Sequence, residues 1–233
     1  MIKEVIILAG GLGTRLASTI IEIPKCLAPV SGKPFLHYVI THLKKQGIEK
    51  FIFALSYKSQ DIINYIRSEH PELKVEFSME EEPLGTGGAI KKACVLLQDK
   101  TVLVVNGDTL FSININKLNL FHDMCGADCT LSLVSMHHFE RFGTVELNKD
   151  YSIKSFKEKQ RCEAGLINGG VYALHAKRFL EEDLHRKFSF EKEYLEKYYN
   201  KRRMFGVIQN EHFIDIGTRE DYAKAQKELT QPR

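Results

Sequence analysis

The chain has little net charge and no long hydrophobic run. Its 33 Lys and Arg residues and 30 Asp and Glu residues give a formal net charge of +3. Nucleic-acid-binding proteins gather a strongly basic surface, so we expect no nucleic-acid partner. No stretch approaches the roughly 18 apolar residues of a membrane span, and the apolar run after Met1 is too short for a signal peptide. We therefore expect no membrane association.

Paired cysteines are also lacking. The five cysteines are an odd number and form no C-x-x-C pair. They are widely scattered, at Cys26, Cys94, Cys125, Cys129 and Cys162. This pattern argues against a disulfide framework or a zinc ribbon. A reducing cytoplasm is the expected location.

Repeats, low-complexity segments and linkers are absent as well. With 233 residues, of which 43% are hydrophobic, the chain is long enough to bury a sizeable core. Nothing in the sequence marks a domain boundary. We expect residues 1–233 to form a single domain.

The first half of the sequence alternates between strand and helix patterns. Short apolar runs rich in β-branched or aromatic residues predict buried strands at residues 4–8, 50–55, 74–79 and 101–106. Between them, helical periodicity covers residues 35–47, 59–70 and 87–98. Such alternation is typical of a parallel sheet with helices on both faces. The sequence thus predicts an α/β fold, a Rossmann-like three-layer sandwich with a mostly parallel central sheet.

The pattern changes after Asp108. Strands with little helix between them are predicted at residues 129–134, 143–148, 152–159 and 166–174, so the sheet should extend through antiparallel and mixed pairing. The last third returns to helix at 190–200 and 218–229, around a strand-like stretch at 204–215. The aromatic residues of 190–200 have the helical spacing of core packing.

A glycine-rich turn, "LAGGLGTRL" at residues 8–16, follows the first predicted strand. The Walker pattern is absent, and the dinucleotide fingerprint fails where Leu16 replaces its third glycine. Gly10, Gly11 and Gly13 can still point backbone N–H groups at phosphate oxygens, with Thr14 and Arg15 at the end of the turn. An ordinary strand-to-helix turn is an equally good interpretation of the loop alone.

A proline-rich arm, "PKCLAPVSGKPFL", follows at residues 24–36. Its three prolines resist regular structure, so we expect an ordered, non-repetitive segment that holds a lysine over the glycine turn. Lys25 and Lys33 are the two candidates. Taken singly, each also fits a solvated surface lysine.

Together these segments resemble the signature of the sugar-1-phosphate nucleotidyltransferases. The resemblance continues, in the order found in that family, through "EEEPLGTGGAI", "VVNGDTL", "FKEKQ", "INGGVYAL" and "FIDIGTREDY", and so covers nearly the whole chain. It implies the nucleotide-diphospho-sugar transferase type of fold. Within the family, the chain looks most like the guanylyltransferases that act on D-glycero-α-D-manno-heptose 1-phosphate.

Two aspartates are candidate ligands of a catalytic Mg²⁺. Asp108 follows a predicted strand of the parallel sheet, so it should lie at the carboxyl edge that also carries the glycine turn. Asp215 follows the segment "EHFI" in the same manner. Locally, each also fits a turn or a helix cap. The resemblance favours the metal, because the family's metal aspartates match "NGD" and "IDIGT".

The resemblance also implies a role for each basic residue and for the sugar pocket. Arg15 should bind the triphosphate, and Lys25 should bridge the α-phosphate and the attacking phosphate. Lys159 should hold the sugar's phosphate and Glu158 its hydroxyls, although Gln160 departs from the family's Glu-Lys-Pro. Otherwise residues 154–163 are a charged strand edge. The implied sugar pocket also includes Gly143, Asn168 and Gly169. The implied nucleotide site comprises Leu8, Gly10, Gly11, Gly13, Thr14, Arg15, Glu80, Gly85 and Thr86.

Glu80 lies in the segment where the family reads the base. A carboxylate only accepts hydrogen bonds, and guanine presents two neighbouring donors, so a glutamate suits GTP. Any two of Glu80, Glu81 and Glu82 also fit a solvated turn. The expected substrates are therefore GTP and a sugar 1-phosphate.

Several alternatives stay open. They are a mannose-1-phosphate guanylyltransferase, a glucose-1-phosphate thymidylyltransferase or uridylyltransferase, and a regulatory subunit that binds a nucleotide sugar without turnover. The presence of Arg15, Lys25, Asp108 and Asp215 favours an enzyme over a regulatory subunit. Exposed apolar positions on the last helices are the basis for expecting a homodimer.

Overall fold

Strands and helices alternate along the first half of the chain, as the sequence predicts. The computed structural model describes residues 1–11, 23–56, 58–140, 142–157 and 161–229. The strands are β1 (Glu4–Leu8), β2 (Pro29–Val30), β3 (Lys33–Pro34), β4 (Lys50–Leu55), β5 (Lys74–Met79), β6 (Thr101–Asn106), β7 (Thr109–Phe111), β8 (Cys129–Phe139), β9 (Thr144–Leu147), β10 (Ile153–Lys157), β11 (Cys162–His175), β12 (Met204–Ile208) and β13 (Phe213–Asp215). The helices are α1 (Phe35–Lys45), α2 (Ser59–Glu69), α3 (Gly85–Ala93), α4 (Ile115–Cys125), α5 (Ala176–Leu180), α6 (Glu196–Tyr198) and α7 (Arg219–Glu228), with short 3-10 turns η1 (Lys25–Leu27) and η2 (Cys94–Leu96) and a π-helical turn η3 (Phe190–Leu195).

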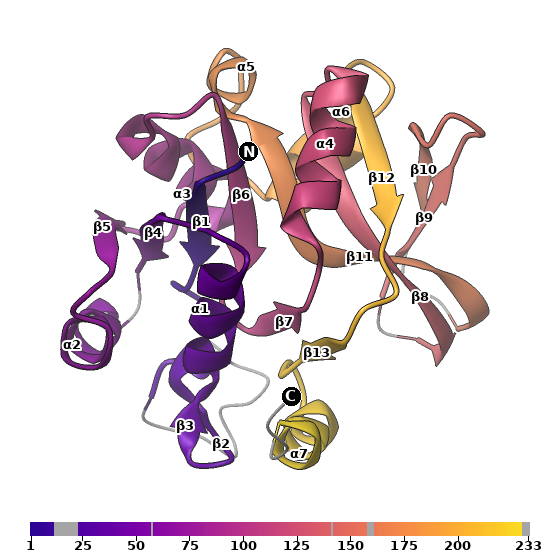
Figure 1. The fold of residues 1–233 in the computed structure, drawn as a ribbon. Helices are drawn as coiled ribbons and strands as arrows, with labels where there is room; N and C mark the ends of the chain where they lie inside the picture. Colours follow the sequence, from indigo (N-terminus) through magenta and orange to yellow (C-terminus); the bar gives the residue numbers. More distant parts are fainter. Residues whose placement is uncertain (12–22, 57, 141, 158–160, 230–233) are drawn as a thin grey trace.

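One mixed sheet runs through the molecule (Figure 1). Its order is β10-β9-β11-β6-β1-β4-β5, and β8 joins it beside β11 with β12 on its other side. Strand β1 is parallel to β4 and β6, and β4 is parallel to β5. Strand β11 is antiparallel to β6, β8 and β9. This confirms the predicted parallel half and its antiparallel, mixed extension.

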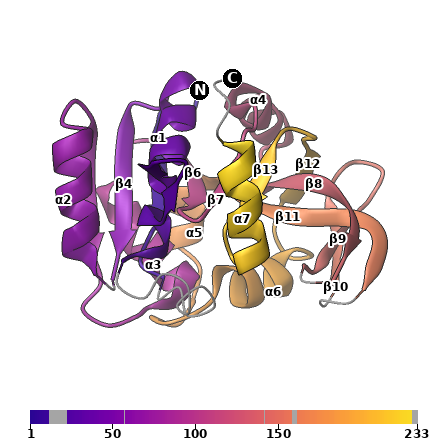
Figure 2. The same ribbon diagram turned by 90° about the horizontal axis from the view of Figure 1, so that it is seen from below.

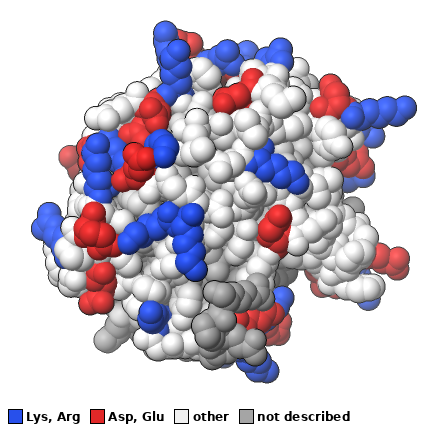
Figure 3. Space-filling model, viewed as in Figure 1, with Lys and Arg blue, Asp and Glu red and all other residues white. Residues whose placement is uncertain are grey.

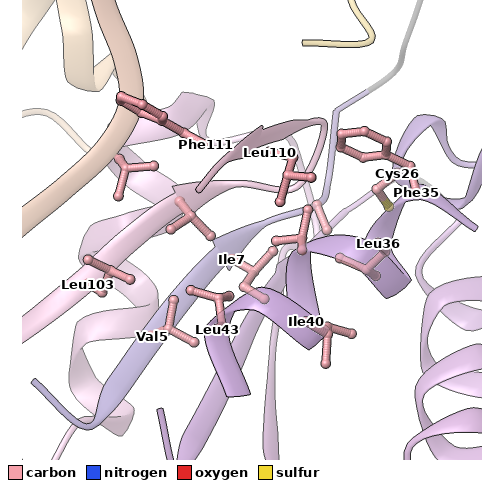
Figure 4. Packing of buried hydrophobic residues seen from close by; sticks show 14 of the residues in the cluster. Val5, Ile7, Cys26, Phe35, Leu36, Ile40, Leu43, Leu103, Leu110 and Phe111 are labelled. Atoms are coloured by element: carbon pink, nitrogen blue, oxygen red, sulfur yellow. The ribbon is translucent and has the colours of Figure 1, made fainter. Parts of the chain in front are cut away.

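Helices cover both faces of the sheet. Successive residues of a strand point to opposite faces, so Val5 and Ile7 pack in one core cluster and Ile6 packs in the other. Figure 4 shows Val5 and Ile7 beside Leu43 and Ile40 of α1. Seen from below in Figure 2, α1 and α4 lie on one side of the sheet and α3 and α6 on the other. The expected three-layer arrangement is confirmed.

Helices α4 and α5 lie where the sequence analysis expected little helix. The ends of α4 carry ordinary signals, because the Asn114 side chain accepts a hydrogen bond from the backbone N–H of Lys117 and Gly126 ends the helix with φ of 53°. Its apolar pattern is weak, since Leu120 and Met124 are exposed. Because its apolar pattern is weak, α4 was not predicted from the sequence, although both of its ends carry capping residues.

Two further segments differ from their predicted form. The strand-like stretch 204–215 is two strands, of which β12 joins the main sheet and β13 pairs with β7 in a separate two-stranded ribbon. The proline-rich arm is ordered, as expected, but it contains η1 and the small hairpin β2–β3. Both differences matter for the site, because the ribbon and the arm reach the same edge of the sheet.

The surface of the described part is mixed in character. Figure 3 shows Lys and Arg side chains interspersed with Asp and Glu side chains on the face in view. Among the described residues, no helix combines the length and the apolar character needed to cross a bilayer. The exposed large apolar side chains are Met1, Ile23, Met79, Val95, Leu120, Met124 and Tyr151. None of these large side chains lies on α5, α6 or α7, where Ala223 is an exposed apolar residue.

Candidate functional site

Two neighbouring cavities open at the carboxyl edge of β1 and β6. The first has a volume of about 450 Å³ and the second about 610 Å³. The first cavity is lined by predicted nucleotide-binding residues, namely Leu8, Gly10, Gly11, Glu80, Gly85 and Thr86, and by the predicted catalytic residues Lys25 and Asp108. Predicted sugar and metal residues line the second, namely Gly143, Asn168, Gly169 and Asp215. The fold therefore brings together residues that are far apart in the sequence and sorts them into two compartments.

Some predicted residues lie outside the described part of the chain. They are Gly13, Thr14, Arg15, Glu158 and Lys159. Of the two lysines in the proline-rich arm, the structure brings Lys25 to the first cavity. Lys33 instead lies 3.1 Å from the His37 ring on the surface, measured from its Nζ to Nε2.

Asp108 lies next to the glycine turn, as predicted from its place after β6. The backbone N–H of Gly107 donates to the carbonyl oxygen of Leu8 at 2.9 Å, which ties the ends of β6 and β1 together. The Lys25 ammonium forms an ion pair with Oδ2 of Asp108. Their side chains are 13% and 34% exposed, respectively, so the pair is only partly screened by water. The Lys25 ammonium and the Asp108 carboxylate therefore lie side by side in the lining of the first cavity.

Asp215 reaches the same place by a route that the sequence analysis did not predict. It ends β13 in the ribbon with β7, opposite Thr109, and not a strand of the parallel sheet. The next residue, Ile216, donates its backbone N–H to the Asp108 carbonyl oxygen at 3.1 Å. Burial, with the nearby Asp108 charge as a second cause, raises the pKa of Asp215. Two carboxylates thus approach each other, one from each cavity.

This pair fits a hard divalent cation. Among the described residues, no group of three or more His, Cys, Asp and Glu side chains has the arrangement of a metal cage. A Mg²⁺-type ion does not need one, because it is commonly held by one or two carboxylates together with substrate phosphates and water. Asp108 in the lining of the first cavity and Asp215 in the lining of the second could supply oxygen ligands to such an ion.

Glu80 is partly fixed within the first cavity. Its Oε2 accepts a hydrogen bond from the Leu84 backbone N–H at 2.9 Å, and burial raises the pKa of its carboxyl group. Glu81 and Glu82, by contrast, are exposed. The three acidic residues therefore divide into one that lines the cavity and two on the solvated turn.

On the sugar side, the Asn168 amide is largely used within the protein. Its Nδ2 donates to the Tyr172 hydroxyl at 2.8 Å, and its Oδ1 accepts from the Gly170 backbone N–H at 3.0 Å. Gly169 allows close packing, because a Cβ there would lie 2.5 Å from the Phe111 ring. Asn168 and Gly169 thus shape the cavity wall as well as line it.

Within the described part of the chain, three residues line both cavities, and none of them was among the predicted site residues. They are Asn106, Glu191 and Gly217. Asn106 and Gly217 lie in the "NGD" and "IDIGT" blocks, which could have pointed to them. Glu191 lies in a segment interpreted as core helix, and its neighbours Phe190 and Tyr194 are indeed buried.

The comparisons with known proteins agree with one another. The profile described as "Nucleotidyl transferase" matches residues 4–232. A D-glycero-alpha-D-manno-heptose 1-phosphate guanylyltransferase of Aneurinibacillus thermoaerophilus is 46% identical, over 97% of this chain and 98% of its own. One of the same name from Campylobacter jejuni is 45% identical, over 94% and 96%. The crystal structure of HddC from Yersinia pseudotuberculosis complexed with GMP-PN has a TM-score of 0.87 and 38% identity, and the match covers 98% of this chain and 100% of that one.

Proposed function

Because the chain belongs to the nucleotidyl transferase family, we propose that it transfers GMP from GTP to D-glycero-α-D-manno-heptose 1-phosphate. The products are GDP-heptose and pyrophosphate. The names of two relatives, both at least 45% identical over nearly the whole chain, support this substrate pair. The observation that carries the proposal is the pair of adjoining cavities, with Lys25 and Asp108 in the first and Asp215 in the second.

The reaction is an in-line displacement at the α-phosphate. An oxygen of the sugar phosphate attacks that phosphorus, and the bond to the bridging oxygen of the β-phosphate breaks, so pyrophosphate leaves with the bonding electrons. The phosphate monoester is already ionised, so no protein nucleophile is required. Catalysis consists mainly of bringing anions together and neutralising their charge. The Lys25 ammonium lies where it can exchange its Asp108 partner for phosphate oxygens.

Enzymes of this kind generally use a divalent metal ion, and we propose Mg²⁺ here. Asp108 and Asp215 would hold the ion through their carboxylate oxygens, and the bound ion would supply positive charge to neutralise the phosphate oxygens. Arg15 on the triphosphate, and Lys159 and Glu158 on the sugar phosphate, remain part of the proposal as the sequence predicts them.

Glu80 provides the basis for choosing guanine. Its carboxylate lines the first cavity and uses one oxygen on Leu84. The other oxygen remains as an acceptor for the N1–H and N2 amino donors of guanine. Uracil and thymine offer a single donor between two acceptors, so they match a carboxylate less well.

The decisive test is pyrophosphate release in the presence of Mg²⁺. The assay uses a grid of four nucleoside triphosphates and several sugar 1-phosphates, with Asp108→Ala as the inactive control. We expect turnover with GTP and the heptose phosphate, and its loss in the control. Preference for mannose 1-phosphate, or for dTTP or UTP, would overturn the assigned substrates. Nucleotide binding without turnover of any pair would instead identify a regulatory subunit.

We also propose that the chain works in the cytoplasm as a homodimer. The five cysteine thiols are all free, in agreement with a reducing compartment. The dimer remains a prediction from the sequence. Light scattering of the purified chain over a range of concentrations tests it, and the mass of a single chain throughout would contradict it.

A further inference from the structure

Glu191 is placed on the wall that separates the two cavities. It is carried by the π-helical turn η3, an uncommon conformation that often occurs at functional sites. Its neighbours Ser189, Lys192, Leu195 and Glu196 line the second cavity alone, whereas Glu191 lines both. The segment therefore faces the second cavity, and Glu191 is its point of contact with the first.

The Glu191 carboxylate is held from one side. The hydroxyl of Thr86 donates to its Oε2 at 2.7 Å, and the hydroxyl of Ser189 donates to the same atom at 2.9 Å. Thr86 in turn accepts a hydrogen bond from the Phe190 backbone N–H at 2.9 Å. No hydrogen bond from a described residue reaches Oε1 of Glu191. One oxygen is therefore fixed, and the other remains as an acceptor on the wall.

Close packing keeps this arrangement in place. A Cβ on Gly87, in the first turn of α3, would lie 2.1 Å from the Phe188 ring, so a glycine is needed for the segment before η3 to pack against α3. The backbones of Gly87 and Phe188 are also joined, at 3.0 Å from N–H to carbonyl oxygen. The glycines of "LGTGG" thus bring Thr86 within reach of Glu191.

We propose that Glu191 is a specificity-determining residue, whose Oε1 accepts a hydrogen bond from a hydroxyl group of the acceptor sugar. A carboxylate repels phosphate groups, so the contact must be with the hydroxyl-bearing part of the ligand. The orientation of Ser189, Lys192 and Leu195 places that ligand in the second cavity. This inference rests on the proposed function, because it assumes that a sugar 1-phosphate occupies that cavity.

Glu191→Gln tests the inference with almost no change of shape. The amide oxygen can still accept from Thr86 and Ser189, which places the NH₂ group where Oε1 was. A donor then replaces the acceptor that faces the sugar. Glu193→Gln is the matched control, because it makes the same change on the same turn at a side chain that lines neither cavity. Its amide oxygen can keep the hydrogen bond that Oε2 of Glu193 accepts from the Ser189 backbone N–H at 2.8 Å.

The readout is KM for each substrate, together with calorimetric binding of the heptose phosphate to protein saturated with a non-transferable GTP analogue. For Glu191→Gln we expect KM and Kd for the sugar phosphate to rise about tenfold or more, as for loss of a hydrogen bond to a charged group. KM for GTP and the thermal midpoint should change little, and Glu193→Gln should resemble the wild type.

Other results would overturn the inference. A rise in KM for GTP alone would assign Glu191 to the ribose, and unchanged constants would make it a purely structural residue. Equal weakening of both substrates with a lower thermal midpoint would have the same meaning. Failure of the proposed function would show separately, as a wild-type chain without turnover, because the binding measurement does not require chemistry.

Discussion

The Asp215 carboxylate is held in an unfavourable position, partly buried and near the Asp108 carboxylate. Both features favour its neutral form, which is why its pKa is raised. Such a position is understandable where a cation and phosphates complete the site. In the proposed mechanism, the chain therefore retains at this residue a group whose burial opposes folding and whose charge serves the reaction.

Asp215→Asn should separate these two effects. The amide oxygen can still accept the hydrogen bond from the Gly217 backbone N–H, but the negative charge is gone. We expect kcat to fall by about 10³-fold, the scale of a lost electrostatic catalytic group, while the thermal midpoint stays equal or rises. Stopped assays and calorimetric melts measure these. The exposed Asp183→Asn is the control, and a variant that kept wild-type turnover would refute the assignment.

Glu80 should give GTP binding a dependence on pH. Because burial raises its pKa, the Glu80 carboxyl takes up a proton at a higher pH than an ordinary glutamate. Protonation removes the acceptor for guanine, so KM for GTP should rise as pH falls through that pKa. A raised folded-state pKa also means that protonation favours the folded chain, and this effect is lost as pH rises. The weaker binding at low pH is therefore not caused by loss of the fold at this group.

Glu80→Gln isolates this effect from the ionisation of GTP itself. The variant should have a raised KM for GTP at neutral pH and lack the part of the pH profile that belongs to Glu80. KM is measured for both proteins from about pH 5 to pH 8, around the ordinary range of glutamate and histidine groups. Identical profiles in the two proteins would remove Glu80 from base recognition.

At the scale of elements, α7 fastens the arm that carries Lys25. Gln226 accepts a hydrogen bond from the Ser31 backbone N–H at 2.8 Å and donates to the Pro29 carbonyl oxygen at 2.6 Å. The Tyr222 hydroxyl donates to the same carbonyl. Helix α7 and the hairpin β2–β3 lie close together at the foot of the molecule (Figure 1). Helix α7, which follows Asp215, thus holds in place residues 29–31, which follow Lys25.

Gln226→Ala should therefore affect catalysis from a distance. It removes two hydrogen bonds and should lower the free energy of unfolding by about 1–3 kcal/mol. We expect kcat to fall roughly tenfold through a displaced Lys25, with smaller changes in KM. Chemical denaturation and initial rates measure the two quantities. Lys224→Ala, which removes an exposed pair with Glu228, is the control, and normal kcat in the Gln226 variant would contradict the coupling.

The elements differ in how far the sequence predicts them. The four parallel strands have the predicted bounds, because short runs rich in β-branched and aromatic residues are distinctive. Strands β1, β4 and β6 are mostly buried, as predicted, whereas β5 lies at the edge of the sheet and is mostly half-buried, which corrects the prediction of a buried strand there. Helix α4 was not predicted, because the exposed residues Leu120 and Met124 make its apolar pattern irregular. Asp108 follows a strand and is placed by topology. The place of Glu191 could not be predicted in this way, because its local pattern is dominated by buried Phe190 and Tyr194. Tertiary packing brings it to Thr86.

At the scale of the whole molecule, β11 joins the two halves of the sheet. This strand is 14 residues long; Val171 to His175 pair with β6, Ile167 pairs with β9, and β8 pairs along most of its length. Both core clusters draw side chains from this strand, such as Ile167 and Tyr172. Because the two halves share this strand, we expect them to unfold together.

We therefore predict that residues 1–233 unfold in a single transition. Far-UV circular dichroism and tyrosine fluorescence, usable because the chain has nine Tyr and no Trp, should give the same midpoint. Leu133→Ala in β8 and Phe53→Ala in β4 should each cost about 2–5 kcal/mol and shift the whole transition. Two separate transitions, with only one moved by Leu133→Ala, would reveal independent domains.

The division of the site into two compartments also bears on how such enzymes diverge. The first cavity is built around the ends of β1 and β6, whereas much of the second belongs to the antiparallel strands beyond them. If the first cavity binds the nucleotide and the second the sugar, as proposed, mutations in the outer strands can alter the accepted sugar while the nucleotide cavity is inherited unchanged. Among the described residues, Asn106, Glu191 and Gly217 line both cavities and so constrain both choices at once. Substitutions at these three positions should be the slowest to accumulate among descendants with new sugars.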